Sequence, residues 1–246
     1  MKNSFVRPFR DVSHGISVCI DRFGVLALPA MLGAMLLSWW VYVPVHELFH
    51  AWGCLLTGGS VSRLEIDSTY GGEWVALLFP YVVSTSGYAG RLSGFDTHGN
   101  DGIYLATVFA PYMLTLLVGL PLLRLAQRTA NPLILGASVP VAYSPFISLT
   151  GDYYELGSIV VSRLVAPWWP QALLQWRSDD LPKLVVALFG AGIRDGLFVD
   201  ALGVAGSLAL GTLLAFGTYQ AGAWIADRMM TGSGDASGSS RQRADV

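Results

Sequence analysis

The chain has 246 residues, of which 53% are hydrophobic and 13% are charged, and its formal net charge is -2. Ordinary soluble domains carry about 25% charged residues, so this composition argues against a soluble protein and favours an integral membrane protein. The charge balance shows no basic excess, which argues against a nucleic-acid-binding protein.

The first residues, 1–22, mix basic and acidic side chains and contain no long apolar core. A secretory signal peptide needs an apolar stretch of about 7–15 residues ahead of a cleavage site, and none is present in this part. We therefore predict a polar N-terminal tail over residues 1–22, followed by a retained membrane helix.

The first apolar segment covers residues 23–56 and exceeds the roughly 20 residues that a helix needs to cross a bilayer. Pro29 and Pro44 offer kinks inside it, and the Thr-Gly-Gly run at 57–59 is a helix-ending signal. Apolar and charged residues then alternate within 61–74, which predicts a short hairpin or a pair of extended strands.

Six further segments complete the pattern. Residues 74–88 are too short for a full crossing and contain Pro80, which favours a partial or re-entrant span, and a polar loop follows at 90–102. An interfacial segment with short helices is expected between the later spans. We predict full spans at 103–125, 132–161 and 197–226, and the interfacial segment at 163–194.

These segments predict an all-α integral membrane protein, a helical bundle of about 4–6 transmembrane or partial spans with a short extended segment after the first apolar helix. Residues 23–227 form one membrane-embedded domain. Residues 228–246 are rich in Gly, Ser and polar side chains, which predicts a disordered C-terminal tail. We expect a multi-pass protein of a cell (inner) membrane, in contact with the lipid bilayer and not with nucleic acid.

Residues 46–50 read His-Glu-Leu-Phe-His and lie inside the first apolar segment. Two histidines four positions apart lie on one face of a helix, where both rings can bind one zinc ion. Glu47 can then act as general base on a zinc-activated water. Because ionisable groups inside a membrane span are costly and usually functional, the motif predicts a zinc hydrolase with His46 and His50 as metal ligands.

A catalytic zinc usually takes three protein ligands, so one more residue is needed. The other histidines, His14 and His98, lie outside the apolar segments. Asp152 and Glu155 lie inside one and are three positions apart, so a helix places both on one face. Either could be the ligand, or Asp152 could cap a helix with Glu155 completing the capping box. We favour Asp152 as ligand, since an unpaired carboxylate at membrane depth is expensive, and expect Glu155 to cap or to support the ligands.

The motif at 46–50, the Thr-Gly-Gly run at 57–59 and a later apolar segment that presents an aspartate resemble the site-2 protease family of intramembrane zinc metallopeptidases. The likeness covers roughly residues 40–160. It implies a Zn²⁺ cofactor and hydrolysis of peptide bonds in a membrane protein or a membrane-bound peptide. It also implies the metal ligands His46, His50 and Asp152, with Glu47 as the catalytic residue.

Two alternatives stay open. One is a membrane zincin that acts at the aqueous boundary with Glu155 as third ligand. The other is a non-enzymatic membrane protein that binds metal ions. An oxidative membrane metalloenzyme is excluded, because such sites need many histidines and this chain has 4. For a protease, residues 61–74 could hold an extended substrate by strand addition, or could be only a structured loop.

Overall fold

The computed structural model describes residues 5–85, 87–190 and 196–241, without the side chains of 232–241. The described residues are mostly helical and include one small sheet. The chain divides into two compact units. The first comprises Met1–Tyr42, Met113–Tyr143 and Thr218–Val246, and the second comprises Val43–Tyr112 and Ser144–Gly217.

The elements fall into three groups. Four helices contribute residues to both units: α2 (Ala27–Leu56), α5 (Tyr112–Leu114), α7 (Pro132–Ile147) and α11 (Leu197–Arg241). The first unit also contains α1 (Arg7–Phe23), the turns η1 (Gly24–Leu26) and η3 (Thr115–Gly119), and α6 (Leu120–Thr129). The second also contains β1 (Ser60–Asp67), η2 (Ser68–Tyr70), α3 (Gly72–Leu78), β2 (Val82–Thr85), β3 (Gly90–Asp96), α4 (Asp101–Phe109), α8 (Asp152–Val165), α9 (Ala172–Gln175) and α10 (Leu181–Phe189).

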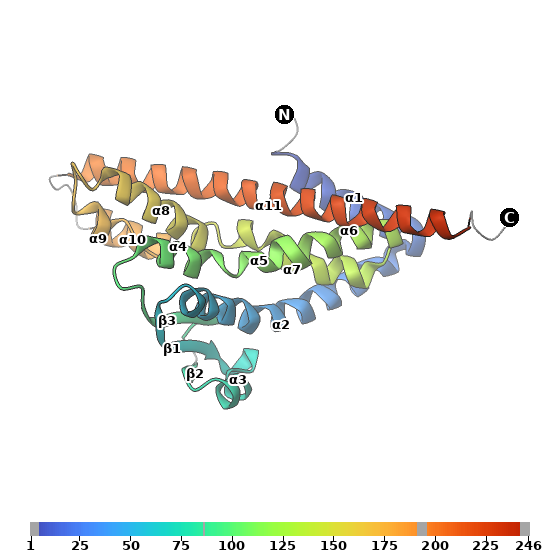
Figure 1. Cartoon of the computed structure of the whole chain (residues 1–246), viewed down its shortest axis with the longest axis horizontal. Coiled ribbons are helices and arrows are strands. Elements are labelled where there is room, and N and C mark those ends of the chain that lie inside the picture. Colours follow the sequence, from blue (N-terminus) through green and yellow to red (C-terminus); the bar gives the residue numbers. More distant parts are fainter. Residues whose placement is uncertain (1–4, 86, 191–195, 242–246) are drawn as a thin grey trace. The chain divides into compact units, whose positions relative to one another are not determined.

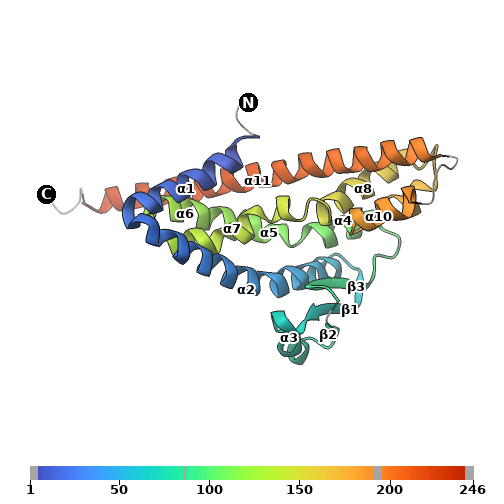
Figure 2. The ribbon, with the colours of Figure 1, turned by 180° about the vertical axis from the view of Figure 1, so that it is seen from behind.

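In the first unit α1 packs against α6, as Figure 2 shows. α1 buries Asp11, Gly15 and Cys19, which recur every four residues and therefore line one face of the helix. Arg124 of α6 donates to the Asp11 carboxylate, with 2.9 Å between Nη2 and Oδ2. Most of the predicted polar tail at 1–22 is therefore a packed amphipathic helix, because its buried carboxylate has a cationic partner.

The sheet lies in the second unit and has the strand order β2-β1-β3, next to α3 in Figure 1. β1 pairs in parallel with β2 and antiparallel with β3. Leu64 and Ile66 of β1 are fully buried and pack in one cluster with Leu48 and Ala51 of α2. The sheet therefore covers one face of the last turns of α2, the helix that carries the His-Glu-x-x-His motif.

The alternation in 61–74 correctly predicts a strand, but the predicted hairpin within that range is wrong. The turn at Gly71 leads into α3, and the antiparallel partner of β1 is β3. β3 occupies the first half of 90–102, which we predicted as a polar loop. Alternation within one strand identifies its buried face but does not specify its partner.

The predicted partial span at 74–88 is instead the end of α3 followed by β2. α3 ends because Phe79 is extended, with φ -128° and ψ 114°, immediately before Pro80. A residue that precedes proline is pushed out of the helical region by the ring of the proline. Part of the apolar surface of this segment packs against the sheet, with Val75, Ala76 and Phe79 beside the buried cluster, while Trp74, Leu77 and Leu78 are exposed.

Three stretches of the described chain are long and apolar enough to cross a membrane: Arg7–Leu56, Pro132–Val165 and Leu197–Thr231. A fourth candidate joins α4 to Tyr112–Thr129 across the break at 110–111. The predicted helical architecture is therefore confirmed in its coarse form. α11 continues to Arg241, so the structure assigns helix to the first part of the predicted tail at 228–246, and residues 242–246 lie outside the described residues.

α8 and α11 approach closely within the second unit because glycines lie at their contact. A Cβ on Gly157 would lie 2.1 Å from the carbonyl oxygen of Ser207, and one on Gly211 would lie 2.2 Å from that of Tyr153. Neither backbone oxygen can move without shifting a helix, so only glycine fits at these two positions. This contact holds the first turn of α8, where Asp152 lies.

We predict that Gly157→Ala destabilises the protein by about 1–3 kcal/mol, because the added methyl group meets a backbone oxygen. For a chain of this size the melting temperature falls by about 2–4 °C for each kcal/mol. Gly217→Ala is the matched control, since nothing lies within 4 Å of its Cβ position and alanine favours helix. Thermal unfolding in detergent micelles compares the two, and equal stability of both variants would contradict this close packing.

Candidate metal centre

His46 and His50 lie on one face of α2, and each is 8% exposed. Leu48, between them in the sequence, and Ala51, directly after His50, face the sheet instead, so the two sides of the helix have separate partners. The two Nε2 atoms are 3.2 Å apart. The i, i+4 spacing therefore brings the two rings together as the sequence predicts.

Asp152 is the first residue of α8, and it brings a carboxylate to the same point. Its Oδ2 lies 3.2 Å from Nε2 of His46 and 3.4 Å from Nε2 of His50. Ligand atoms at about 2.0–2.1 Å from a tetrahedral zinc ion lie about 3.3–3.4 Å from one another. The separations of the three atoms therefore fit three corners of such a site, and their chemistry, two imidazoles and a carboxylate, is a zinc ligand set.

The alternative role of Asp152 as a helix cap does not occur. Gly151 occupies the capping position of α8, with φ -109° and ψ -112°, and a glycine has no side chain with which to cap the helix. The carboxylate of Asp152 instead accepts from Tyr112, with 2.6 Å between the hydroxyl and Oδ2. This hydrogen bond fixes the orientation of the carboxylate toward the histidines, as outer partners of metal ligands commonly do.

Glu155 does not join the three ligands. Among the described residues, the group of potential metal ligands comprises His46, His50 and Asp152. Glu155 is one helical turn further along α8, and its Oε1 accepts from the hydroxyl of Tyr104 at 2.5 Å. Of the two carboxylates that the sequence left open, the structure therefore places Asp152 beside the histidines and Glu155 at a separate position.

A main-chain carbonyl fixes the ring of His50. Its Nδ1 lies 2.9 Å from the oxygen of Thr107 in α4. A carbonyl can only accept, so Nδ1 carries the proton and Nε2 presents its lone pair to the metal position. Gly53 permits this contact, because a Cβ there would lie 2.5 Å from Cβ of Ala110 and would push α2 away from α4.

Pro111 explains why the Thr107 carbonyl is available. In an α-helix this oxygen would accept from the amide four residues later, and residue 111 is a proline without an N–H. The helical ladder accordingly ends with the bond from the Ala110 amide to Ala106, at 2.9 Å. The proline thus leaves one buried acceptor for His50 to satisfy.

Glu47 lies between the two histidines in the sequence and lines the same cavity as His50 and Asp152. β3 approaches it closely: a Cβ on Gly90, the first residue of that strand, would lie 2.3 Å from Cγ of Glu47. The glutamate side chain is therefore confined between its own helix and the backbone of β3. This arrangement holds a potential general base next to the ligand group.

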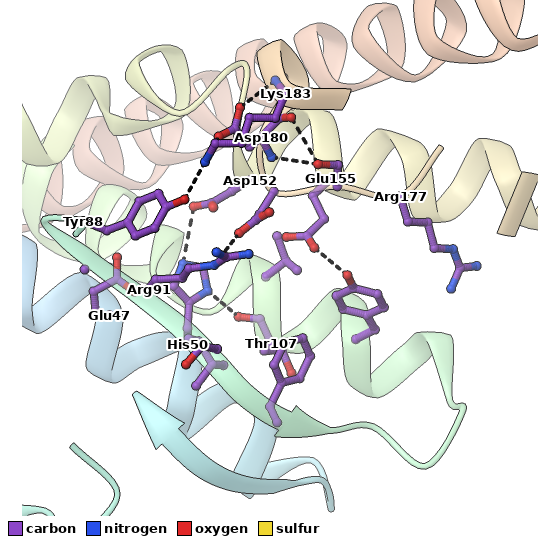
Figure 3. Close-up of a pocket in the computed structure, with 18 residues that line it drawn as sticks. Glu47, His50, Tyr88, Arg91, Thr107, Asp152, Glu155, Arg177, Asp180 and Lys183 are labelled. Atoms are coloured by element: carbon purple, nitrogen blue, oxygen red, sulfur yellow. Dashed lines mark hydrogen bonds and ion pairs between the residues drawn. The ribbon is translucent and has the colours of Figure 1, made fainter. Parts of the chain in front are cut away.

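The cavity has a volume of about 710 Å³ and lies in the second unit, where Figure 3 shows its lining side chains. Its far side is charged, with Arg91 of β3 paired to Asp179 at 3.0 Å. Lys183 pairs with Asp180 at 2.8 Å, and its hydrogen bonds lower the pKa of that carboxyl. The cavity is therefore polar enough to hold water, which a hydrolytic site requires.

The structure brings together the predicted ligands His46, His50 and Asp152 and places Glu47 on the same cavity, but sequence reasoning missed the residues that orient these side chains. Thr107 acts through its backbone, Tyr112 and Tyr104 are tyrosines in apolar segments, and Gly90 acts through its missing side chain. The one available signal is Pro111, because a proline leaves the carbonyl four residues before it without a helical partner.

The chain matches no protein-family model, no curated protein and no solved structure.

We predict that Asp152→Asn lowers bound zinc at least about tenfold, because the amide loses the negative charge and is a weak ligand. Glu155→Gln is the matched control and should retain zinc, since its side chain bonds to Tyr104 rather than to the histidines. Elemental analysis of the purified proteins measures both. If Asp152→Asn kept a full complement of bound zinc while Glu155→Gln lost it, Glu155 rather than Asp152 would be the third metal ligand.

Pro111→Ala should weaken zinc binding by about 10- to 100-fold, the usual effect of losing an outer partner of a ligand. The new amide would take the Thr107 carbonyl and leave the His50 ring without its orienting acceptor. Thr107→Val is the control, because it changes the side chain and keeps the carbonyl. Competition with a chromophoric chelator gives both affinities, and unchanged affinity in Pro111→Ala would refute the role of the proline.

Proposed function

We propose that this chain is a zinc-dependent membrane metalloendopeptidase. Its metal ligands are His46, His50 and Asp152, and Glu47 is the general base. The observation that carries the proposal is the convergence of two Nε2 atoms and one Oδ2 atom within 3.2–3.4 Å of one another. Three such acceptors at this distance repel each other unless a cation or protons lie between them.

The chemistry follows from the positions of the side chains. A bound zinc ion would polarise the scissile carbonyl and lower the pKa of water toward about 7. Glu47 takes the proton of the attacking water and later delivers one to the leaving amine. Thr107 keeps His50 in place, and Tyr112 keeps Asp152 in place. The ligands therefore do not have to reorganise during the reaction.

The membrane setting is supported by the three apolar helical stretches. The histidines belong to the first of these and Asp152 to the second. We propose that the protein is a multi-pass protein of a cell (inner) membrane and that it acts on a membrane protein or a membrane-bound peptide. Charged side chains line the cavity and can bind the water that hydrolysis needs, although the surrounding helices are apolar.

The substrate must be extended at the cleavage site, because a helix hides its carbonyls in its own hydrogen bonds. The strand that the sequence suggested as a clamp, β1, is paired on both edges and cannot accept another strand. β3 has one edge without a partner among the described strands, and its first residue touches Glu47. We propose that the substrate adds to that edge and so lies against the catalytic glutamate.

We predict that Glu47→Gln retains zinc and loses cleavage activity by about 10²–10⁴-fold, because it cannot accept the proton of water. The probe is a mixture of unstructured peptides whose cleavage is followed by mass spectrometry, with and without a zinc chelator. Glu73→Gln, an exposed position outside the cavity, is the matched control and should stay active. A Glu47→Gln protein as active as wild type would contradict the mechanism, and zinc binding without any cleavage in wild type would favour a non-enzymatic metal protein.

Gly90→Ala tests the contact between β3 and the glutamate. The added methyl group overlaps the Glu47 side chain, so we expect the rate of cleavage to fall about tenfold or more while bound zinc stays the same. Gly87→Ala is the control, since nothing lies within 4 Å of its Cβ position. The measurement is kcat for one cleaved peptide, and an unchanged kcat in Gly90→Ala would show that the contact has no part in positioning the base.

A further inference from the structure

We propose that Glu155, held by Tyr104, is a subsite for a cationic side chain of the substrate, a lysine or an arginine close to the scissile bond. The proposal deepens the proposed peptidase function and rests on it for the identity of the ligand as a peptide. It arises from one carboxylate of the cavity that the metal centre does not use.

Glu155 is 8% exposed and lines the cavity. Its Oε1 accepts from the Tyr104 hydroxyl, which fixes the rotation of the carboxylate. Within the described part of the chain, Oε2 has no hydrogen-bond donor and neither oxygen forms an ion pair. A buried carboxylate in this state is costly, so a cation that enters the cavity gains from pairing with it.

The cations of the cavity are already paired with other carboxylates. The Arg177 guanidinium binds Asp101 through two nitrogens, at 2.7 and 3.1 Å. Arg91 and Lys183 bind Asp179 and Asp180 in the ion pairs described above. Arg91 and Lys183 cannot turn to Glu155 without leaving their own acids, and Arg177 would give up two short hydrogen bonds to Asp101. These three side chains therefore leave Glu155 without a cationic partner, which the substrate can supply.

The charge of the metal centre does not change this conclusion. A divalent ion together with Asp152 and Glu47 is neutral as a group, since the histidines carry no charge when they bind metal. The negative charge of Glu155 then remains uncompensated beside the reaction centre. A lysine or arginine suits this position, because its long apolar stem can lie along the cavity wall while its head reaches the carboxylate.

The reach of the subsite follows from the helix. Glu155 lies one turn beyond Asp152, and side chains three residues apart on a helix have Cβ atoms about 5–6 Å apart. An extended peptide advances about 3.3 Å per residue. The subsite therefore accepts a side chain within about two residues of the bond that the metal centre addresses. It selects substrates with a basic residue at that place.

Equilibrium binding tests this selection. Zinc-loaded wild-type protein, which keeps the charge of Glu47, is mixed in uncharged detergent micelles with fluorescent Ala-Ser-Ala-Xaa-Ala-Ser-Ala peptides, in which Xaa is lysine, norleucine or glutamate, and binding is read by stopped flow before cleavage. We expect the lysine peptide to bind at least about tenfold more tightly than the norleucine peptide, as is usual for a hydrogen bond between charged groups. The glutamate peptide should bind most weakly. If the lysine and norleucine peptides bind equally well to this protein, in which Glu155 is unchanged, the proposal is overturned.

A second substitution assigns the preference to one residue. The Glu155→Gln substitution in the otherwise wild-type protein keeps the acceptor for Tyr104 and removes the charge, so the preference for lysine should fall below about twofold. The Glu73→Gln substitution, at an exposed position, should leave the preference intact. A preference that persists in the Glu155→Gln protein assigns recognition to another group and overturns the proposal.

The same peptides separate this proposal from the peptidase function. If wild type binds all three peptides equally well and cleaves them with equal kcat/KM, the subsite is refuted and the peptidase function is supported. If the protein prefers lysine through Glu155 but cleaves none of the peptides, the peptidase function is refuted and the cation site is supported.

Discussion

The hydrogen bond between His50 and the Thr107 carbonyl is the contact on which the geometry of the candidate metal centre depends. It sets the protonation of the imidazole ring, and it exists because Pro111 cannot use that carbonyl for its own helix. A proline, which normally weakens a helix, thus leaves a carbonyl oxygen that accepts a hydrogen bond from the neighbouring helix α2. Gly53 completes the arrangement, because its missing side chain lets α2 and α4 approach closely enough for the bond to form.

Asp152 depends on a different kind of contact. α8 is fixed by close packing against α11 through Gly157 and Gly211, so its first turn has little freedom to move. Tyr112 then holds the carboxylate by a hydrogen bond from its hydroxyl. Backbone contacts place the helix, and one tyrosine selects the orientation of the side chain. A ligand set preorganised in this way pays little entropy when a metal ion binds.

The cavity has an asymmetric distribution of charge. Its basic side chains are held in ion pairs at the side formed by β3 and residues 177–183, while Glu155 meets only a tyrosine hydroxyl. The candidate metal centre, β3 and Glu155 border the same cavity, and under the proposed function each would address another part of a peptide. The reacting carbonyl, the backbone and one side chain would be recognised separately, which is how selectivity and catalysis can be built on a small site.

The sequence by itself pointed to the proposed metal ligands and base, because i, i+4 histidines with an intervening glutamate, and an aspartate inside a later apolar segment, are typical of zinc hydrolases. It also determined the mostly helical architecture, since long apolar segments have a local signature. It did not determine the pairing of β1 with β3, the packing of α1, or the separation of Glu155 from Asp152. These depend on contacts made after folding, such as a glycine against Glu47 and a tyrosine hydroxyl beside each carboxylate. Such contacts join residues far apart in the chain, and apart from Pro111, which frees the Thr107 carbonyl, no local pattern in the sequence encodes them.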